Sequence, residues 1–354
     1  MNVTYTGKLN VGGSGIGLTA FHQVKPLFEA GILEKVYCEG VSTDLIPPNY
    51  FESMPFLQAP YRVQDNMFDV EVAMKLEEVD ILQSWGSHCY WTMKKFPKAT
   101  KIVNLYSAHP VVQRDLMGKD LQQLGLPLPD EMLLKKFCKE LMICDHIFVP
   151  SEFILKTLEP FDLAHKATMV PFGVDLDKFT ISDYNTDKFK VIFVGSNWAR
   201  KGLQYLLTAW KKFVEEYPDA DSELVVAGTD AKFTGLEDNV RVGWVKDLTE
   251  ELRTSSLFML PTLEDGCPLA TYEAMACGIP VVVSNTTGTA QHIREGYNGF
   301  IISPANTQEI YDKLVYFYEN RSETKRMGRN ARLMAEAFPW ERHEQGYLKF
   351  IKSI

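Results

Sequence analysis

The sequence lacks any long hydrophobic run. No apolar stretch approaches the roughly 18 residues that a membrane-spanning helix requires, and the opening segment, MNVTYTGKLN, has no apolar signal-peptide core. These absences argue against an integral membrane protein and against export. The sequence therefore predicts a cytoplasmic protein, with peripheral contact at the inner face of the membrane as the alternative.

Paired cysteines and a broad positive charge are also missing. The six cysteines form neither a C-x-x-C pair nor the spacing of a zinc site, so we expect reduced, mostly buried thiols and no metal. A formal net charge of −9 leaves no broad basic field with which to displace counterions from a nucleic-acid backbone. We therefore expect no nucleic-acid partner.

What is present is material for two globular domains. A chain of 354 residues, with 45% hydrophobic and 23% charged residues, is long enough for two separate cores. Strand and helix patterns alternate in both halves, which predicts an α/β protein with two doubly wound parallel sheets. We place the first domain at residues 1–180 and the second at residues 188–337. The polar, turn-rich segment ISDYNTDK (181–188) separates them.

The most informative stretch is residues 257–284, LFMLPTLEDGCPLATYEAMACGIPVVVS. Two apolar runs predict buried parallel strands, joined by an acidic loop and a short helix that starts at Pro268. Asp265 lies in the loop and Glu273 about two turns inside the helix, so both can point into one crevice. Acids beside a helix N-terminus suit a sugar joined to a phosphate. An ordinary capped helix with solvated acids fits the spacing equally well.

This stretch resembles the signature of a known family. The order acid-Gly-x-x-Leu-x-x-x-Glu-Ala-Met-Ala-Cys-Gly-x-Pro-Val-Val is similar to that of glycosyltransferase family 4, retaining enzymes of the GT-B fold. The family signature has two glutamates separated by seven residues, and Asp265 and Glu273 stand in their places. The first acid is therefore one methylene shorter here. Cys267 and Pro268 replace the Phe-Gly often found after it.

A basic loop opens the second domain. The strand pattern FKVIFVG (189–195) runs through SNWARK into a helix pattern, and Arg200 and Lys201 there are suited to a diphosphate. The family loop usually reads Gly-Arg-x-x-x-x-Lys-Gly. Lys201 and Gly202 match it, whereas Ser196 stands where the arginine is expected, and we hypothesise that Arg200 substitutes for it.

A glycine-rich loop near the N-terminus has the shape of a phosphate loop. In GKLNVGGSGIG the glycines, among them Gly13 and Gly15, allow backbone N–H groups to approach a ligand ahead of a helix. Gly15, Gly17 and Ala20 also fit the G-x-G-x-x-A pattern of dinucleotide-binding folds. In those folds the first glycine follows the strand directly, whereas Gly15 lies well beyond the first strand pattern. A merely flexible loop is the other alternative.

Two further segments of the first domain have open interpretations. His109 ends the strand pattern KIVNLYSAHP, where an imidazole can hydrogen-bond a sugar hydroxyl. A lone histidine is more often structural, but family members often carry one in this loop. The segment YWTMKKFPKATK (90–101) mixes aromatic residues with lysines, a composition that suits an anionic membrane surface or an ordinary solvated face.

The resemblance implies a function. A hexose-type sugar would pass, with retention, from a UDP- or GDP-sugar to an unidentified acceptor, which is a saccharide, a lipid-linked molecule or a small molecule. The reaction would take place in a cleft between two Rossmann-like domains, with no cofactor or metal, and a final helix at about 338–354 would cross back to the first domain. A GT-B sugar-nucleotide epimerase and a non-catalytic sugar-nucleotide-binding subunit are the alternatives.

The resemblance also implies roles for individual residues. Glu273 would hold the ribose hydroxyls and Asp265 the transferred sugar, while Arg200, Lys201 and helix N-termini stabilise the leaving diphosphate. The predicted catalytic residues are His109, Lys201 and Asp265. The predicted donor-binding residues are Gly13, Gly15, Ser196, Arg200, Lys201, Val245, Asp265, Gly266, Cys267, Pro268, Leu269 and Glu273.

Overall fold

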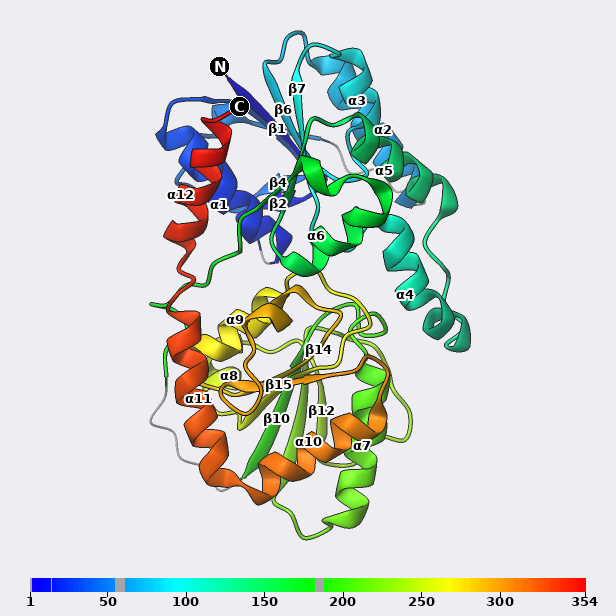
Figure 1. Cartoon of the computed structure of the whole chain (residues 1–354), viewed down its shortest axis with the longest axis vertical. Helices are drawn as coiled ribbons and strands as arrows, with labels where there is room; N and C mark the ends of the chain where they lie inside the picture. Colours follow the sequence, from blue (N-terminus) through cyan, green and yellow to red (C-terminus); the bar gives the residue numbers. More distant parts are fainter. Residues whose placement is uncertain (1, 14, 55–60, 182–187) are drawn as a thin grey trace. The chain divides into compact units, whose positions relative to one another are not determined.

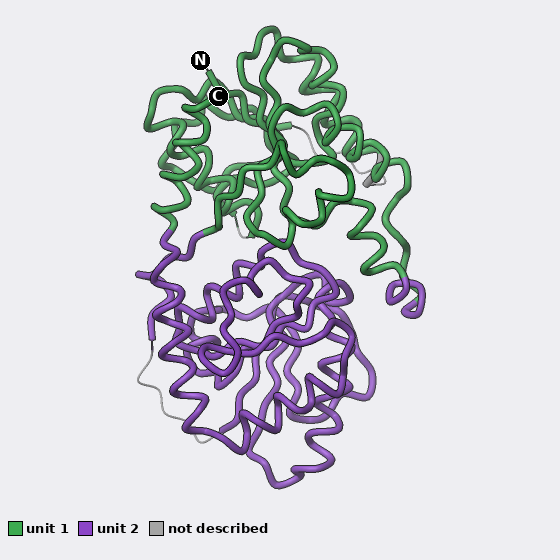
Figure 2. Tube along the Cα trace, in the orientation of Figure 1, with its two compact units in different colours: residues 1–118, 125–172, 340–354 green, residues 119–124, 173–339 purple. Residues whose placement is uncertain are grey.

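The chain divides into two compact units. The computed structural model describes residues 2–13, 15–54, 61–181 and 188–354, so most of the predicted boundary segment, residues 182–187, lies outside the described residues. The first unit comprises residues 1–118, 125–172 and 340–354, and the second comprises residues 119–124 and 173–339 (Figure 2). Each unit is described separately below.

The first unit is built on a seven-stranded parallel sheet. The strand order is β5-β3-β1-β6-β7-β8-β9, so the chain winds away from β1 in both directions. Figure 1 labels β1, β6 and β7 of this sheet. A doubly wound parallel sheet was predicted, and such strands are apolar along their length because helices cover both faces. The strands are β1 (Val3–Thr6), β3 (Leu33–Cys38), β5 (Phe51–Ser53), β6 (Ile81–Trp85), β7 (Thr100–Asn104), β8 (His146–Val149) and β9 (Ala167–Met169).

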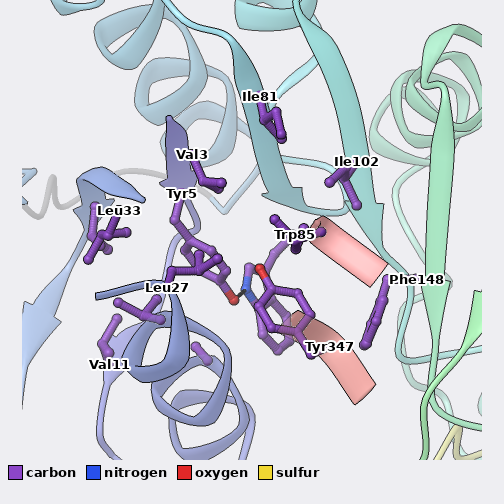
Figure 3. Close-up of a cluster of buried hydrophobic side chains, with 14 of the residues drawn as sticks. Val3, Tyr5, Val11, Leu27, Leu33, Ile81, Trp85, Ile102, Phe148 and Tyr347 are labelled. Atoms are coloured by element: carbon purple, nitrogen blue, oxygen red, sulfur yellow. Dashed lines mark hydrogen bonds between the residues drawn. The ribbon is translucent and has the colours of Figure 1, made fainter. Parts of the chain in front are cut away.

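Helices pack on this sheet around two apolar clusters. One cluster gathers side chains from α1, β1 and α12, with Tyr5, Trp85 and Tyr347 at its centre (Figure 3). The other gathers side chains from α2, α3 and α5. The α-helices are α1 (Ile16–Glu29), α2 (Tyr61–Lys75), α3 (Tyr90–Lys95), α4 (Pro110–Gln123), α5 (Glu131–Ile143), α6 (Glu152–Leu158) and α12 (Trp340–Ile351). The last helix of the chain thus returns to the first unit, as predicted.

Shorter elements complete the first unit. A two-stranded parallel ladder joins Asn10 to Gly40 and Val11 to Val41. The elements are β2 (Asn10–Val11), β4 (Gly40–Val41), η1 (Pro48–Tyr50), η2 (Glu159–Phe161) and η3 (Ala164–Lys166).

The second unit has a six-stranded parallel sheet. Its order, β12-β11-β10-β13-β14-β15, reverses direction beside β10 (Figure 1). The strands are β10 (Phe189–Val194), β11 (Ser222–Ala227), β12 (Val240–Gly243), β13 (Leu257–Leu260), β14 (Val281–Ser284) and β15 (Gly299–Ile302). The helices are α7 (Leu203–Glu216), α8 (Leu248–Arg253), α9 (Leu269–Ala276), η4 (Gly288–His292), α10 (Thr307–Glu319) and α11 (Arg321–Ala335).

The strand–helix–strand unit predicted over residues 257–284 is present as β13, α9 and β14, with one shift. Pro268 is the residue before α9 rather than its first residue, because its ψ of 115° is extended and not helical. Gly278 lies just past the helix with φ of +75°, as expected of a helix-ending glycine. Within the described residues no helix is long and apolar enough to cross a membrane.

Candidate functional site

The candidate site lies where the sheet of the second unit changes direction. Strands β10 and β13 are neighbours and parallel, so their carboxyl ends meet at one edge. The basic loop at 195–202 follows β10, and the acidic loop at 261–268 follows β13. Ligands of open α/β sheets bind at this kind of edge.

Four charged side chains from these loops form one cluster. Lys201 Nζ lies 2.7 Å from Asp265 Oδ2, and Arg200 Nη2 lies 3.6 Å from the same oxygen. Arg200 Nη1 donates to Glu264 Oε2 at 3.3 Å and to the Glu264 carbonyl at 3.2 Å. The structure therefore brings three predicted residues, Arg200, Lys201 and Asp265, into contact.

Glu264 was not predicted as a site residue. Its side chain is fully buried beside Arg200, where an unpaired carboxylate would carry a large desolvation cost. The sequence did contain a signal for Glu264, because two adjacent acids follow β13 just as two adjacent cations follow β10. Nothing local indicated that the first acid pairs with the arginine.

Backbone contacts fix the two loops to each other. The Leu263 N–H donates to the Arg200 carbonyl at 2.8 Å, and the Thr262 hydroxyl donates to the same oxygen at 3.0 Å. Gly202 precedes α7 with φ of +73°, and a Cβ there would lie 1.9 Å from the Pro261 carbonyl oxygen. Only glycine permits this approach, so the start of α7 and the end of β13 depend on it.

Electrostatics keep Asp265 and Arg200 ionised. Burial raises the pKa of Asp265, but the charges of Lys201 and Arg200 lower it more, and the resulting pKa lies below its ordinary value. Burial lowers the pKa of Arg200, yet Asp265 and Glu264 raise it above its ordinary value. The site therefore contains two cations that are already paired with two carboxylates.

Glu273 has a different environment on α9. Burial raises the pKa of its carboxyl to about 7, with Lys178 acting weakly in the other direction. No hydrogen bond or ion pair of this carboxyl is formed within the described part of the chain, although the side chain is only partly buried. A carboxyl of this kind can accept hydrogen bonds from an incoming hydroxyl.

The start of α9 adjoins the acidic loop. No side chain caps this helix, so its first N–H groups, near Leu269, have no side-chain acceptor. A helix N-terminus of this kind favours an anionic ligand. The predicted residues Gly266, Cys267 and Pro268 are buried in the turn before it. The Cys267 thiol contacts the Tyr272 hydroxyl at 3.8 Å.

Two other predicted residues of the second unit lie apart from the charged cluster, Ser196 at the start of the basic loop and Val245 in the loop after β12. Ser196 is in the turn after β10, where its carbonyl accepts from the Trp198 N–H at 3.1 Å. Val245 is half-buried after β12, next to Trp244, which is 73% exposed. Neither contacts the charged cluster in the interactions that the structure shows.

Three predicted residues lie in the first unit. Gly13 and Gly15 are in the loop between β2 and α1, so β2 separates this loop from β1, unlike the direct strand-to-glycine turn of dinucleotide-binding folds. His109, before α4, is 2% exposed and stacks on Phe161 with 3.5 Å between ring centroids. Burial lowers the pKa of His109 to about 4, which leaves the imidazole neutral at pH 7.

Asp175 and Asp177 form an Asp-x-Asp pattern, which in other proteins can bind a metal ion. Asp175, in the Asp-Leu-Asp triplet, uses its carboxylate to accept from the N–H groups of Asp177 at 3.1 Å and Lys178 at 2.9 Å. The triplet therefore closes a turn. Among the described residues no group of three His, Cys, Asp or Glu side chains is placed to hold a metal ion.

Comparison with known families shows what the second unit is similar to. The family described as Glycosyl transferases group 1 matches residues 188–320, a range that includes the basic loop, the acidic loop and α9. This unit is similar to the group 1 glycosyltransferases. The family resemblance found in the sequence is thereby confirmed.

Curated relatives match this chain over part of their length. One is the UDP-Gal:alpha-D-GlcNAc-diphosphoundecaprenol alpha-1,3-galactosyltransferase of Escherichia coli, 29% identical over 172 residues, which cover 42% of this chain and 44% of the relative. The chain spans about half the length of the curated relatives it matches, 46%, 44% and 48% for three of them.

Solved structures match the whole chain. Sucrose-phosphate synthase from Thermosynechococcus elongatus superimposes with a TM-score of 0.82 at 14% identity, covering 100% of this chain and 99% of that one. The HepE protein of Anabaena, in complex with UDP, gives 0.72 at 15% identity and covers 100% of both chains. Identities this low establish the fold alone. The fold is GT-B, as the resemblance implied.

Proposed function

We propose that the protein is a retaining glycosyltransferase that moves a hexose-type sugar from a UDP- or GDP-sugar to an acceptor. The observation that carries the proposal is the cluster of Arg200, Lys201, Glu264 and Asp265 at the edge where β10 and β13 end. It supplies cations for a diphosphate and acids for hydroxyls in one place. The printed names of the relatives agree, since one uses UDP-Gal and a structural neighbour holds UDP.

The proposed roles follow from the charges. The Lys201 ammonium has three donors and Asp265 accepts from one of them, so others are available to the diphosphate. Arg200 and the N-terminus of α9 add positive potential where charge develops on the leaving group. In this proposal these groups supply the stabilisation that a metal ion would otherwise give. Asp265 accepts from hydroxyls of the transferred sugar, and Glu273 accepts from the ribose.

Retention needs no enzymic nucleophile in this scheme. The resemblance to family 4 implies attack from the face of the leaving group, with the leaving phosphate accepting the proton of the acceptor hydroxyl. His109 would then contact the transferred sugar as a neutral imidazole, and this role stays a prediction.

The acceptor is proposed only as a class. The Escherichia coli relative is named for a lipid-linked, diphosphoundecaprenol acceptor. We therefore propose a lipid-linked acceptor for this chain, in preference to a free saccharide or a small molecule.

The test begins with binding and ends with turnover. We expect UDP or GDP to raise the melting temperature more than ADP does. Lys201→Ala should weaken binding of that nucleoside diphosphate about tenfold or more, because a charged hydrogen-bonding partner is lost. Lys211→Ala, an exposed lysine of α7, is the matched control and should bind as the parent does.

Glu273→Ala should abolish sugar transfer while the protein remains folded.

Other outcomes favour other functions. Donor consumed with no acceptor product supports an epimerase, and donor bound with no turnover in any acceptor mixture supports a binding subunit. Calorimetry that finds equal nucleotide affinity in the parent and in Lys201→Ala would remove the basic loop from the site.

A further inference from the structure

The first unit carries an apolar, lysine-bearing surface that its own core does not use. Helix α2 exposes four apolar side chains at helical spacing, Val63, Met67, Val70 and Met74, the last of them 77% exposed. We call the exposed side of α2, α3 and α5 the α2–α3–α5 face. Its other exposed apolar side chains are Trp91 on α3 and Met132 and Met142 on α5.

A groove joins the apolar residues of two of these helices. Asp69 of α2 pairs with Lys136 of α5 at 3.0 Å, and this buried pair holds the two helices together. Met132, one turn before Lys136, therefore lies beside the apolar stripe of α2. The groove between them has a volume of about 620 Å³ and is lined by the apolar stripe of α2 and by Met132, together with Asn66 and Glu71. Contiguous apolar surface of this kind marks an interaction site.

Helix α3 extends the face towards the lysines of α5. Its N-terminal N–H groups at Trp91 and Thr92 donate to Asp69, which fixes α3 beside α2. The Tyr90 ring lies between two ammonium groups, with Lys94 at 5.7 Å and Lys139 at 5.9 Å from its centroid. Cationic side chains of α3 and α5 are therefore neighbours around Tyr90, on a helix that packs beside α2.

The lysines of the face are of two kinds. Lys75 pairs with Glu52 and Glu71, and Lys135 pairs with Glu131, whereas others have no acidic partner among the described residues. Residues 90–101 contain four lysines and no acidic residue. Two of them are used internally, since Lys95 donates to the carbonyls that end α2 and Lys101 donates to nearby loop carbonyls. Lys94, Lys98 and Lys139 are exposed and form no ion pair with any described residue. A basic patch thus stands out on a chain whose net charge is −9.

Charge and side-chain chemistry select the occupant. A second copy of the chain, bound through the same face, would bring the lysines of both copies together, and like charges at an interface are unfavourable. An anionic bilayer accepts the lysines at its headgroups and the flexible methionines and Trp91 at the boundary of the acyl chains. We propose that the α2–α3–α5 face binds the surface of an anionic phospholipid bilayer.

Binding to a bilayer would place the proposed glycosyltransferase next to its acceptor. This link rests on the proposed function only through the proposal that the acceptor is lipid-linked. A glycosyltransferase held on a bilayer by its first unit meets lipid-linked acceptors where they are anchored. Binding to the bilayer needs no donor, so the two proposals fail separately.

The experiment is co-sedimentation of the full chain with vesicles at low salt. We expect binding to vesicles of phosphatidylglycerol and phosphatidylcholine, and none to phosphatidylcholine alone. Lys94→Glu/Lys139→Glu should lower the partition coefficient at least about 25-fold, about fivefold for each lysine lost. Met67→Glu/Met74→Glu should lower it about tenfold or more, because apolar insertion is removed. Leu333→Glu, an exposed leucine of α11 in the second unit, is the control and should bind normally.

Defined results would overturn the proposal. One is parent protein that stays in the supernatant with anionic vesicles. Another is binding by both double variants equal to that of the parent. A third is a parent dimer, seen by light scattering, that Met67→Glu/Met74→Glu converts to monomer, since the face would then serve a second copy. Unchanged circular dichroism and unchanged UDP or GDP affinity in every variant show that folding and the donor site are intact.

Discussion

Asp265 is a residue at which this chain departs from the family signature, and the structure shows how the shorter acid is accommodated. Lys201 reaches its carboxylate at 2.7 Å. The lysine stem passes over Gly195, where an added Cβ would lie 2.1 Å from Lys201 Cδ. The shorter aspartate side chain is therefore compensated by the close approach of Lys201. The absence of a Cβ at Gly195 leaves space for the lysine stem.

Glu273 gives a prediction about protons. Its pKa of about 7 means that roughly half of the free protein carries this proton at pH 7. Ribose hydroxyls donate to the ionised form and stabilise it, so nucleotide binding should lower the pKa and release protons at pH 7. Calorimetry in two buffers with different protonation enthalpies measures the release. Glu273→Gln should bind more weakly and release none, and a parent that releases no proton would contradict the ribose contact.

The loops after β10 and β13 act as one element because they are joined through the backbone. The carbonyl of Arg200 accepts from both Leu263 and Thr262, and Gly202 brings the start of α7 against Pro261. The cations and the acids cannot separate without breaking these bonds. The rigidity of the pair is what places four charges at fixed positions for a ligand.

A substitution at Gly202 tests this joint. Gly202→Ala adds a Cβ that would meet the Pro261 carbonyl and also places alanine at positive φ, so we expect a loss of at least about 3 kcal/mol in the free energy of unfolding. Gly235→Ala is the control, because its φ is +70° and no atom lies within 4 Å of the added Cβ. It should cost roughly 1–2 kcal/mol. Urea denaturation measures both, and equal losses would show that close packing at Gly202 contributes nothing.

For the molecule as a whole, the notable feature is that the chain returns to the unit in which it began. After α11 it enters α12, whose Tyr347 is buried in the core of the first unit with Tyr5 and Trp85 (Figure 3). Phe350 and Ile351 of α12 are buried in the same cluster. His22 and Lys25 of α1 pair with Glu344 at 2.6 and 3.1 Å. The first unit is therefore complete only when the end of the chain has been added.

Tyr347 tests this dependence. Tyr347→Ala removes a buried ring from the first unit, and we expect a loss of about 3–5 kcal/mol. Hydrogen–deuterium exchange should show lost protection in β1 and β6, while β10 and β13 of the second unit keep theirs. Tyr347→Phe, which removes only the hydroxyl that donates to Gln83, should cost about 1 kcal/mol. Equal loss of protection in both units would contradict a separate core for each.

Much of this was predictable from local patterns. Apolar runs bounded by proline and glycine located β13, α9, β14 and the strand β10, because buried parallel strands and helix ends have residue preferences that act over a few positions. The spacing of Asp265 and Glu273 led to the family for the same reason, since the motif lies within one strand–helix–strand unit.

Contacts between distant residues were not predictable in this way. Arg200 and Glu264 are 64 positions apart, and their pairing depends on which strands become neighbours and on a glycine that lets two loops touch. The same holds for the lysines of residues 90–101, which look alike in the sequence and divide into internal donors and exposed cations only in the folded chain, where Lys95 reaches carbonyls at the end of α2 and Lys101 reaches carbonyls of its own loop. The sequence specifies the elements and the chemistry at their ends, whereas packing determines which charges meet and which remain for a ligand or a surface.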